Sequence, residues 1–229
     1  MRRILSFLFG WCFIIACVVF SIKSTALNPN FYIPKYEEMH LAQDIGVSKK
    51  DLNQSIRLLL DYLDDKRDDI KGTITWYGNH QETFNERETS HMGDVKALYQ
   101  NAVKVAKISL VILALILLYF YWNEKEKMFA NLSKGCLGAL LTLSIMLVFF
   151  GFWILTDFTS FWTWFHTIFF SNQLWLLDPN TDFMICMLPE TIFYQLVLSC
   201  VIKVICLMVP VSLLSIYYMV KKAPIGFER

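Results

Sequence analysis

The apolar residues of the chain are gathered into four long runs that contain few charged side chains. The runs cover residues 5–22, 102–122, 135–155 and 192–220. Coiled as a helix at about 1.5 Å per residue, each run is long enough to cross the hydrocarbon core of a bilayer, which is roughly 30 Å thick. The pattern therefore predicts four transmembrane helices.

The first run also has features of a cleavable signal peptide. Arg2 and Arg3 precede it, and the segment Ser24, Thr25, Ala26 after it resembles a cleavage site. A removed signal and a retained membrane anchor both fit this pattern. We favour retention and expect a first membrane helix within 1–22.

Basic residues next to the runs predict how the chain is oriented. They precede the first span, fill the link between the second and third spans and follow the fourth, at Arg2, Arg3, Lys125, Lys127, Lys134, Lys221, Lys222 and Arg229. Residues 157–190 contain no Lys or Arg. Because Lys and Arg are retained in the cytoplasm, both termini and the short link should be cytoplasmic. The expected order is 1–22 span, 23–101 extracellular cap, 102–122 span, 123–134 cytoplasmic link, 135–155 span, 156–191 outer segment, 192–220 span and 221–229 cytoplasmic tail.

The cap has local signals of its own. Ser48 with Asp51 resembles a helix-capping box, and apolar residues recur after it with helical spacing, which predicts a helix ending near Asp65. Residues 72–78 predict a short strand or hairpin edge. The expected fold is an all-α membrane protein of four transmembrane helices with a small, mainly helical extracellular cap.

Composition agrees with this fold class and excludes several functions. Hydrophobic residues make up 55% of the 229 residues and charged residues only 18%, which argues against a water-soluble globule. A formal net charge of +1 gives no basic field for binding nucleic acid. The six cysteines form no C-x-x-C pair, so neither a disulfide framework nor a metal site is expected.

The outer segment is unusually aromatic. Between Phe158 and Trp175, eight of eighteen residues are Phe or Trp, which suits rings at the headgroup level of a membrane. A simple membrane anchor would explain this density. Polar residues interrupt the belt, however, at His166, Ser171 and Asn172. We therefore interpret the segment as part of a site.

The four histidines differ in their surroundings. His40 and His80 lie in polar segments and are expected to be exposed. His91 follows residues that can cap a helix leading into the second span, Thr89 or Ser90, and Asp94 lies on the same helical side, where it can orient the ring. A capping role is the simplest explanation of His91. For His91 to meet His166, that helix must tilt, kink near 100–101 or lie along the membrane surface.

Lysines near the outer ends of the spans form a third group. Lys203 is expected to extend towards the outer boundary, at the same depth as Lys104 and Lys107. Contacts with lipid headgroups or acidic residues explain these lysines without any role in a site. A role at a substrate headgroup is the alternative.

Familiar catalytic motifs are missing from the sequence. There is no G-x-S-x-G, H-E-x-x-H, Walker or Rossmann pattern, which disfavours nucleotide, zinc and esterase-type serine chemistry. Two imidazoles near a membrane surface suit proton transfer, in which one ring accepts a proton and the other donates one. Ser90 or Ser171 as a nucleophile has no support in the spacing.

Several segments resemble the bacterial family of lipoprotein intramolecular transacylases. They are SHMGDVKALY at 90–99, FHTIFFSNQLWLLDP at 165–179, YIPKY at 32–36 and MLPE at 187–190. The resemblance covers nearly the whole chain. It implies a four-helix enzyme of the bacterial cell membrane with two catalytic histidines, which correspond to His91 and His166, at the outer leaflet.

The resemblance also implies a reaction. The fatty acyl chain on the sn-2 oxygen of a diacylglyceryl lipoprotein moves to the α-amino group of its own N-terminal Cys, giving the lyso form without a covalent enzyme intermediate. We expect supporting roles for Asp94, Ser171, Asn172 and Lys203, and a confining aromatic wall of Phe161, Trp162, Trp164, Phe169 and Trp175. The expected partners are the diacylated lipoprotein and membrane lipid, with no cofactor, metal or nucleic acid, and the expected state is a monomer.

Two other function classes stay open at this stage. A lipid-moving carrier would show paired broken helices or inverted halves, and the chain has only one span with an internal proline, Pro210. A non-catalytic membrane protein whose cap binds an envelope partner would not need either imidazole.

Overall fold

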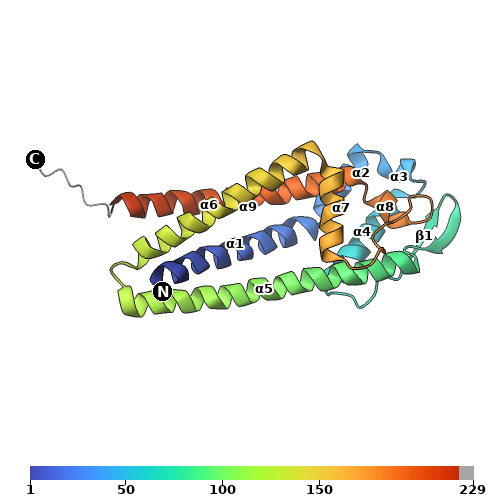
Figure 1. The fold of residues 1–229 in the computed structure, drawn as a ribbon. Coiled ribbons are helices and arrows are strands. Elements are labelled where there is room, and N and C mark those ends of the chain that lie inside the picture. Colours follow the sequence, from blue (N-terminus) through green and yellow to red (C-terminus); the bar gives the residue numbers. More distant parts are fainter. Residues whose placement is uncertain (222–229) are drawn as a thin grey trace, which may run out of the picture. The chain divides into compact units, whose positions relative to one another are not determined.

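The computed structural model describes residues 1–221, and the predicted tail beyond them lies outside the described residues (Figure 1). Helices dominate, and one short hairpin is present. The elements are α1 (Arg2–Ala26), α2 (Pro29–Glu38), α3 (Leu41–Asp44), α4 (Lys49–Leu63), β1 (Thr73–Trp76), β2 (Asn79–Glu82), α5 (Glu86–Glu124), α6 (Met128–Thr156), α7 (Phe158–Phe169), α8 (Phe183–Met187) and α9 (Glu190–Lys221).

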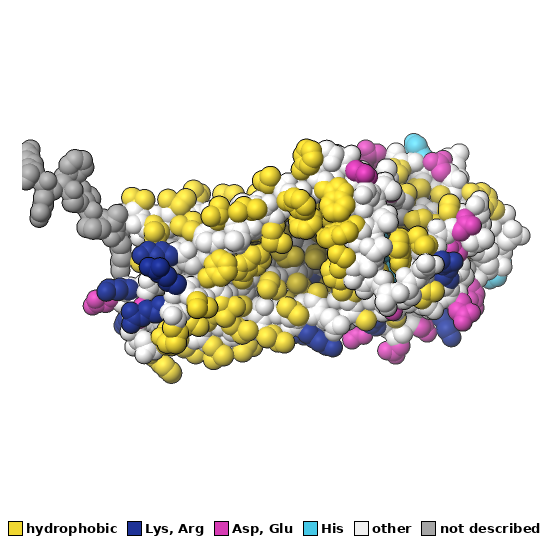
Figure 2. Space-filling model, in the orientation of Figure 1, with side chains coloured by type: hydrophobic (Ala, Val, Ile, Leu, Met, Phe, Trp, Pro, Cys, Tyr) yellow, Lys and Arg dark blue, Asp and Glu magenta, His cyan; other side chains and the backbone are white. Residues whose placement is uncertain are grey.

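Four helices are long and apolar enough to cross a membrane, as the sequence predicts. They are α1, α5, α6 and α9. Large apolar side chains on these helices stay exposed, for example Val148 at 74% and Phe152 at 71% of their surface. Figure 2 shows yellow hydrophobic side chains along these helices. Because such a surface is unfavourable in water and favourable in lipid, the chain is a membrane protein.

The described chain divides into two compact units. The first, here called the bundle unit, holds residues 1–21, 103–156 and those from 201 onwards. The second, the cap unit, holds residues 22–102 and 157–200. The helix α5 contributes its polar N-terminal turns to the cap unit and its apolar remainder to the bundle unit. Both histidines singled out from the sequence, His91 and His166, belong to the cap unit.

Within the bundle unit, α1 and α6 approach closely through glycines. A methyl group added at Gly135 would lie 2.0 Å from the backbone carbonyl of Ser6, and one added at Gly10 would lie 2.7 Å from the Ala139 side chain. Small residues at such contacts let two membrane helices pack backbone against backbone. Gly135 therefore fixes this helix pair.

Replacing Gly135 with alanine should destabilise the bundle unit by about 1–3 kcal/mol, because backbone atoms must move apart to admit the methyl group. Gly151, on the same helix, has open space around it, so Gly151→Ala is a matched control. Thermal unfolding in detergent micelles, followed by circular dichroism, measures both variants. Equal unfolding temperatures for the two would contradict this packing.

The cap unit has its own apolar core. The predicted helix is confirmed as α4, and its Ser48 hydroxyl accepts a hydrogen bond from the Asp51 backbone N–H at 3.0 Å. The predicted strand is confirmed as the antiparallel pair β1 and β2, which turns through Tyr77 and Gly78, both with positive φ. The core joins the apolar face of α4 to α8 through Leu52, Ile56, Leu59, Phe183 and Met187.

The helix α5 begins earlier than the sequence indicated. Thr89 and Ser90 lie inside it, and the cap is Asn85, whose side-chain oxygen accepts from the Glu88 N–H while Glu88 accepts from the Asn85 N–H. This reciprocal pair is a capping box with Asn in place of Ser or Thr. The helix then runs unbroken to Glu124, which excludes the kink considered at residues 100–101.

Candidate functional site

The two histidines meet inside the cap unit. His91 lies in the second turn of α5 and His166 near the C-terminal end of α7, and their ring centroids are 6.0 Å apart. Both side chains are buried, with 5% of His91 and 8% of His166 exposed. His91 is therefore a buried side chain and not a helix cap. His40 and His80 are exposed, as predicted.

Local sequence positions His166 on its helix. Asp157 caps α7 by accepting a hydrogen bond from the Ser160 N–H at 3.0 Å. The His166 Nδ1 atom lies 2.7 Å from the Trp162 carbonyl oxygen one turn earlier. A carbonyl only accepts, so Nδ1 of the ring carries the proton and donates it there. The neutral ring then keeps an unshared electron pair on Nε2, where it can accept a proton.

Aromatic side chains surround the two imidazoles. Trp162 and Phe165 meet His166 edge to face, with centroids at 4.8 and 5.7 Å. Phe170 contacts both histidines, at 5.2 Å from His91 and 5.6 Å from His166. Trp175 stacks on His166 at 4.9 Å with 30° between the planes. This enclosure leaves little room for water around the imidazole pair.

Burial shifts the pKa values of both rings in the same direction. His91 lies before the apolar run of α5, and its burial, reinforced by repulsion from His166, lowers its pKa to about 4, although Asp94 opposes the shift. Burial likewise lowers the pKa of His166, and the hydrogen bond to Trp162 offsets part of the effect. Both imidazoles are therefore neutral at pH 7.

The predicted supporting residues have different positions. The Asp94 carboxylate accepts a hydrogen bond from the Asn172 amide at 2.8 Å, so it holds the connection after α7. The Nδ1 atom of His91 has no hydrogen-bond partner among the described residues. The Ser171 side chain is exposed, and Lys203 lies on α9 in the bundle unit.

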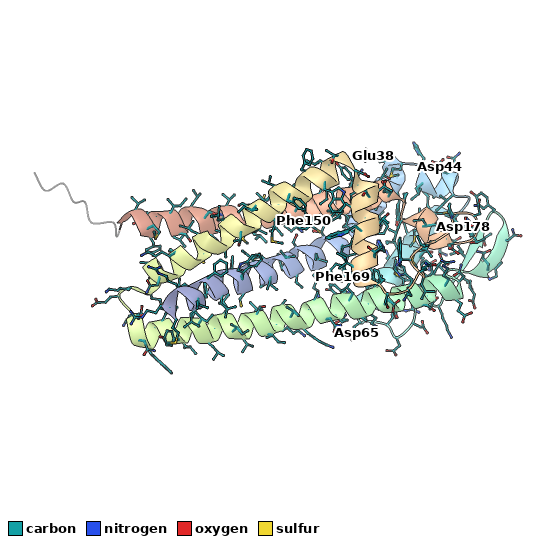
Figure 3. The ribbon with its side chains drawn as sticks, viewed as in Figure 1. Glu38, Asp44, Asp65, Phe150, Phe169 and Asp178 are labelled. Carbon is teal, nitrogen blue, oxygen red and sulfur yellow. The ribbon has the colours of Figure 1, made fainter. Side chains whose placement is uncertain are left out.

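The predicted aromatic wall is present in part at the histidines. Trp162 and Trp175 contact His166 directly. Phe161 and Trp164 pack on each other at 6.0 Å, while Phe169, labelled in Figure 3, packs on Phe165 at 4.7 Å. These three side chains form the flank of α7.

Three residues near the histidines were not assigned a role from the sequence. Phe170 follows the aromatic helix directly and contacts both rings. Arg87 precedes His91 by four positions, a spacing that places both on one side of α5, and it donates to the Gln173 carbonyl at 2.8 Å. Only the helical spacing of Arg87 was visible in the sequence, since its partner lies 86 residues away.

The third such residue is Glu88, which is 1% exposed. Its carboxylate accepts from the backbone N–H of Asn85 at 2.7 Å and of Met184 at 2.5 Å. Burial raises its pKa to about 7 despite these two donors. Glu88 thus joins the first turn of α5, three residues before His91, to α8.

The described residues contain no group of three or more His, Cys, Asp or Glu that could hold a metal ion. The histidine pair is therefore interpreted through its own acid and base chemistry.

Comparison with known proteins connects this geometry to a family. The sequence model of the family described as "Lipoprotein intramolecular transacylase Lit" matches residues 7–193. The solved structure of the membrane integral lipoprotein intramolecular transacylase Lit from Bacillus cereus is similar, with a TM-score of 0.74 and 19% identity over 97% of each chain. A variant of that protein with a histidine-to-alanine mutation aligns with a TM-score of 0.72 and 18% identity, over 97% of this chain and 95% of the other. A comparison with curated protein sequences found no match.

Proposed function

Because this chain belongs to the lipoprotein intramolecular transacylase family, we propose that it moves the sn-2 acyl chain of a diacylglyceryl lipoprotein to the α-amino group of the lipoprotein's N-terminal Cys. The chain is an acyltransferase of the membrane, and the proposal concerns which acyl chain moves and how. One observation carries it: two neutral, buried imidazoles lie 6.0 Å apart inside an aromatic enclosure.

The geometry of the substrate explains why an enclosure is needed. Counting the amine nitrogen, Cα, Cβ, sulfur, two glycerol carbons, the ester oxygen and the acyl carbon gives an eight-membered ring in the tetrahedral intermediate. A flexible chain seldom closes such a ring. Holding the amine against the ester in the correct orientation can lower the barrier by roughly 7–11 kcal/mol. The enclosure around His166 supports this role.

The histidines move the protons of the reaction. One ring takes a proton from the attacking amine, and the other gives a proton to the departing glyceryl oxygen. His166 fits the accepting role, because its Nδ1 donates to the Trp162 carbonyl and leaves Nε2 as an acceptor. No serine or cysteine nucleophile takes part, so no acyl-enzyme forms. Ser171 and Lys203 are candidates to stabilise the oxyanion.

We also propose the orientation of the protein and its state. Arg2, Arg3 and Lys134 line one pocket of the bundle unit, which supports a cytoplasmic position for this end. In that orientation both termini are cytoplasmic and the histidine pair acts at the outer leaflet. The protein acts as a monomer, because both proposed catalytic rings belong to one chain.

The lowered pKa values of His91 and His166 predict a specific pH profile. Both rings stay neutral below their ordinary value of 6.5, so the histidines should not limit activity there. The substrate amine, with a pKa near 8, then sets the profile. The logarithm of kcat/KM should rise with a slope of about one from pH 6 towards 8. A slope of two that begins near pH 6.5 would contradict neutral, buried rings.

Mass spectrometry of a lipoprotein tests the function itself. The N-terminal peptide of a host lipoprotein is compared with and without expression of this chain in a bacterium that makes diacylated lipoproteins. Expression should convert the peptide to a form with one acyl chain on glycerol and one on the α-amino group. An unchanged diacylglyceryl peptide would refute the proposed function.

A further inference from the structure

The connection between α7 and α8 is held against α5 at several points. It carries little regular structure between Phe170 and Asp182, and Asp178 within it is labelled in Figure 3. The Arg87 guanidinium on α5 donates to the carbonyls of Gln173 at 2.8 Å and Leu174 at 3.4 Å. These contacts fasten the chain just before Trp175.

Asn172 makes the other attachment. Its side-chain amide donates to the Asp94 carboxylate on α5 at 2.8 Å, and its side-chain oxygen accepts from the Leu174 N–H at 3.0 Å. Its backbone carbonyl accepts from the indole N–H of Trp175 at 3.0 Å. With its amide directed to Asp94, Asn172 acts as a positioning residue and not as an oxyanion donor.

These contacts determine where the Trp175 ring lies. The indole N–H is bound to Asn172, Asn172 is bound to α5, and the ring stacks on His166 at 4.9 Å. The other rings at His166, Trp162 and Phe165, come from α7 itself. Trp175 is thus the covering ring that depends on the connection, and its place depends on the bonds to α5.

We propose that Arg87, Asp94 and Asn172 form a latch that keeps Trp175 over His166 and so decides whether the acyl chain goes to the amine or to water. The inference rests on the proposed function and adds a determinant of its product. With the latch closed, the ester meets only the amine of its own molecule. With the latch open, water reaches the same ester and the same imidazole.

The two outcomes share one broken bond. In transfer, the amine nitrogen bonds to the acyl carbon, the bond from that carbon to the glyceryl oxygen breaks, and one proton passes from nitrogen to that oxygen. In hydrolysis, a water oxygen bonds to the acyl carbon, the same bond breaks, and one water proton passes to the glyceryl oxygen. Transfer yields the N-acyl lyso form, whereas hydrolysis yields a free fatty acid. The ratio of these products therefore reports the latch.

A pair of substitutions tests the bond between Asn172 and Asp94. Asn172→Asp places two carboxylates together and should raise the ratio of free fatty acid to N-acyl product about tenfold, because a charge-assisted hydrogen bond is lost. Adding Asp94→Asn to this variant exchanges the two partners and rebuilds the bond in the opposite direction. The double variant should return the ratio to near the wild-type value.

The matched control lies in the same connection. Asn180 donates its side-chain amide to Asp178 at 2.8 Å, an Asn–Asp bond with no partner on α5. Asn180→Asp should leave the product ratio unchanged. All variants are compared as full-length protein in detergent with a synthetic diacylglyceryl lipopeptide, and thermal unfolding shows which of them are folded.

The outcomes separate this inference from the proposed function. No N-acyl product from the wild type would refute the proposed function. Normal wild-type product with an unchanged ratio in Asn172→Asp, or with no recovery in the double variant, would overturn the latch. If Asn172→Asp does not fold, Arg87→Ala decides by the same ratio, since it removes the two bonds to the carbonyls of Gln173 and Leu174. An unchanged ratio there would also overturn it.

Discussion

Replacing either His91 or His166 with alanine should lower formation of the lyso form by roughly 10²–10⁴-fold. Each ring handles a proton that the amine loses or the glyceryl oxygen gains, and water in the emptied site is a weaker and poorly placed substitute. The rings act as one unit, so removing both should cost little more than removing one. Turnover of a synthetic diacylglyceryl lipopeptide, followed by mass spectrometry, measures these losses.

The exposed histidines provide the matched controls. His40→Ala and His80→Ala should keep wild-type turnover, because neither ring lies in the buried site. Thermal unfolding of all four variants shows whether each protein is folded. Near-normal turnover in folded His91→Ala and His166→Ala would remove the basis for the assigned chemistry.

Replacing Glu88 with alanine should lower the free energy of unfolding by about 2–6 kcal/mol. The buried backbone N–H groups of Asn85 and Met184 would both lose their acceptor, at about 1–3 kcal/mol for each. Glu88→Gln keeps one acceptor oxygen and should lose about half as much. Denaturant or thermal unfolding in detergent measures the loss.

Glu86 gives the matched control for this prediction. It also lies in the first turn of α5, but its side chain is exposed. Glu86→Ala should cost about 0.3–1 kcal/mol, the usual worth of an acidic side chain near a helix N-terminus. Equal losses for Glu86→Ala and Glu88→Ala would show that the two buried bonds add nothing to stability.

Periodicity and local caps were sufficient to predict much of the fold. Four apolar runs correspond to α1, α5, α6 and α9, because a membrane helix is specified by its own sequence. The Ser48 cap of α4 and the hairpin were equally local signals. The true start of α5 was missed, since its first turns are polar and their Asn–Glu capping box was not recognised in the sequence.

The site was predictable only where residue type was itself informative. His166 stood out because an imidazole in an aromatic belt is unusual, and exclusion of the exposed histidines left His91. The roles of Arg87 and Glu88 depend on partners 86 and 96 residues away, which no local pattern reveals. Asn172 was noticed for its amide, but its bond to Asp94 depends on tertiary structure.

A label-crossover experiment tests the central claim most directly. One diacyl lipopeptide carries ¹³C in its sn-2 acyl chain and ¹⁵N in its N-terminal Cys, and it is mixed with unlabelled lipopeptide and the wild-type protein. If the histidine pair acts on one folded substrate at a time, every ¹³C-acylated amine will also contain ¹⁵N. Products in which ¹³C acyl chains appear on unlabelled amines would contradict the account.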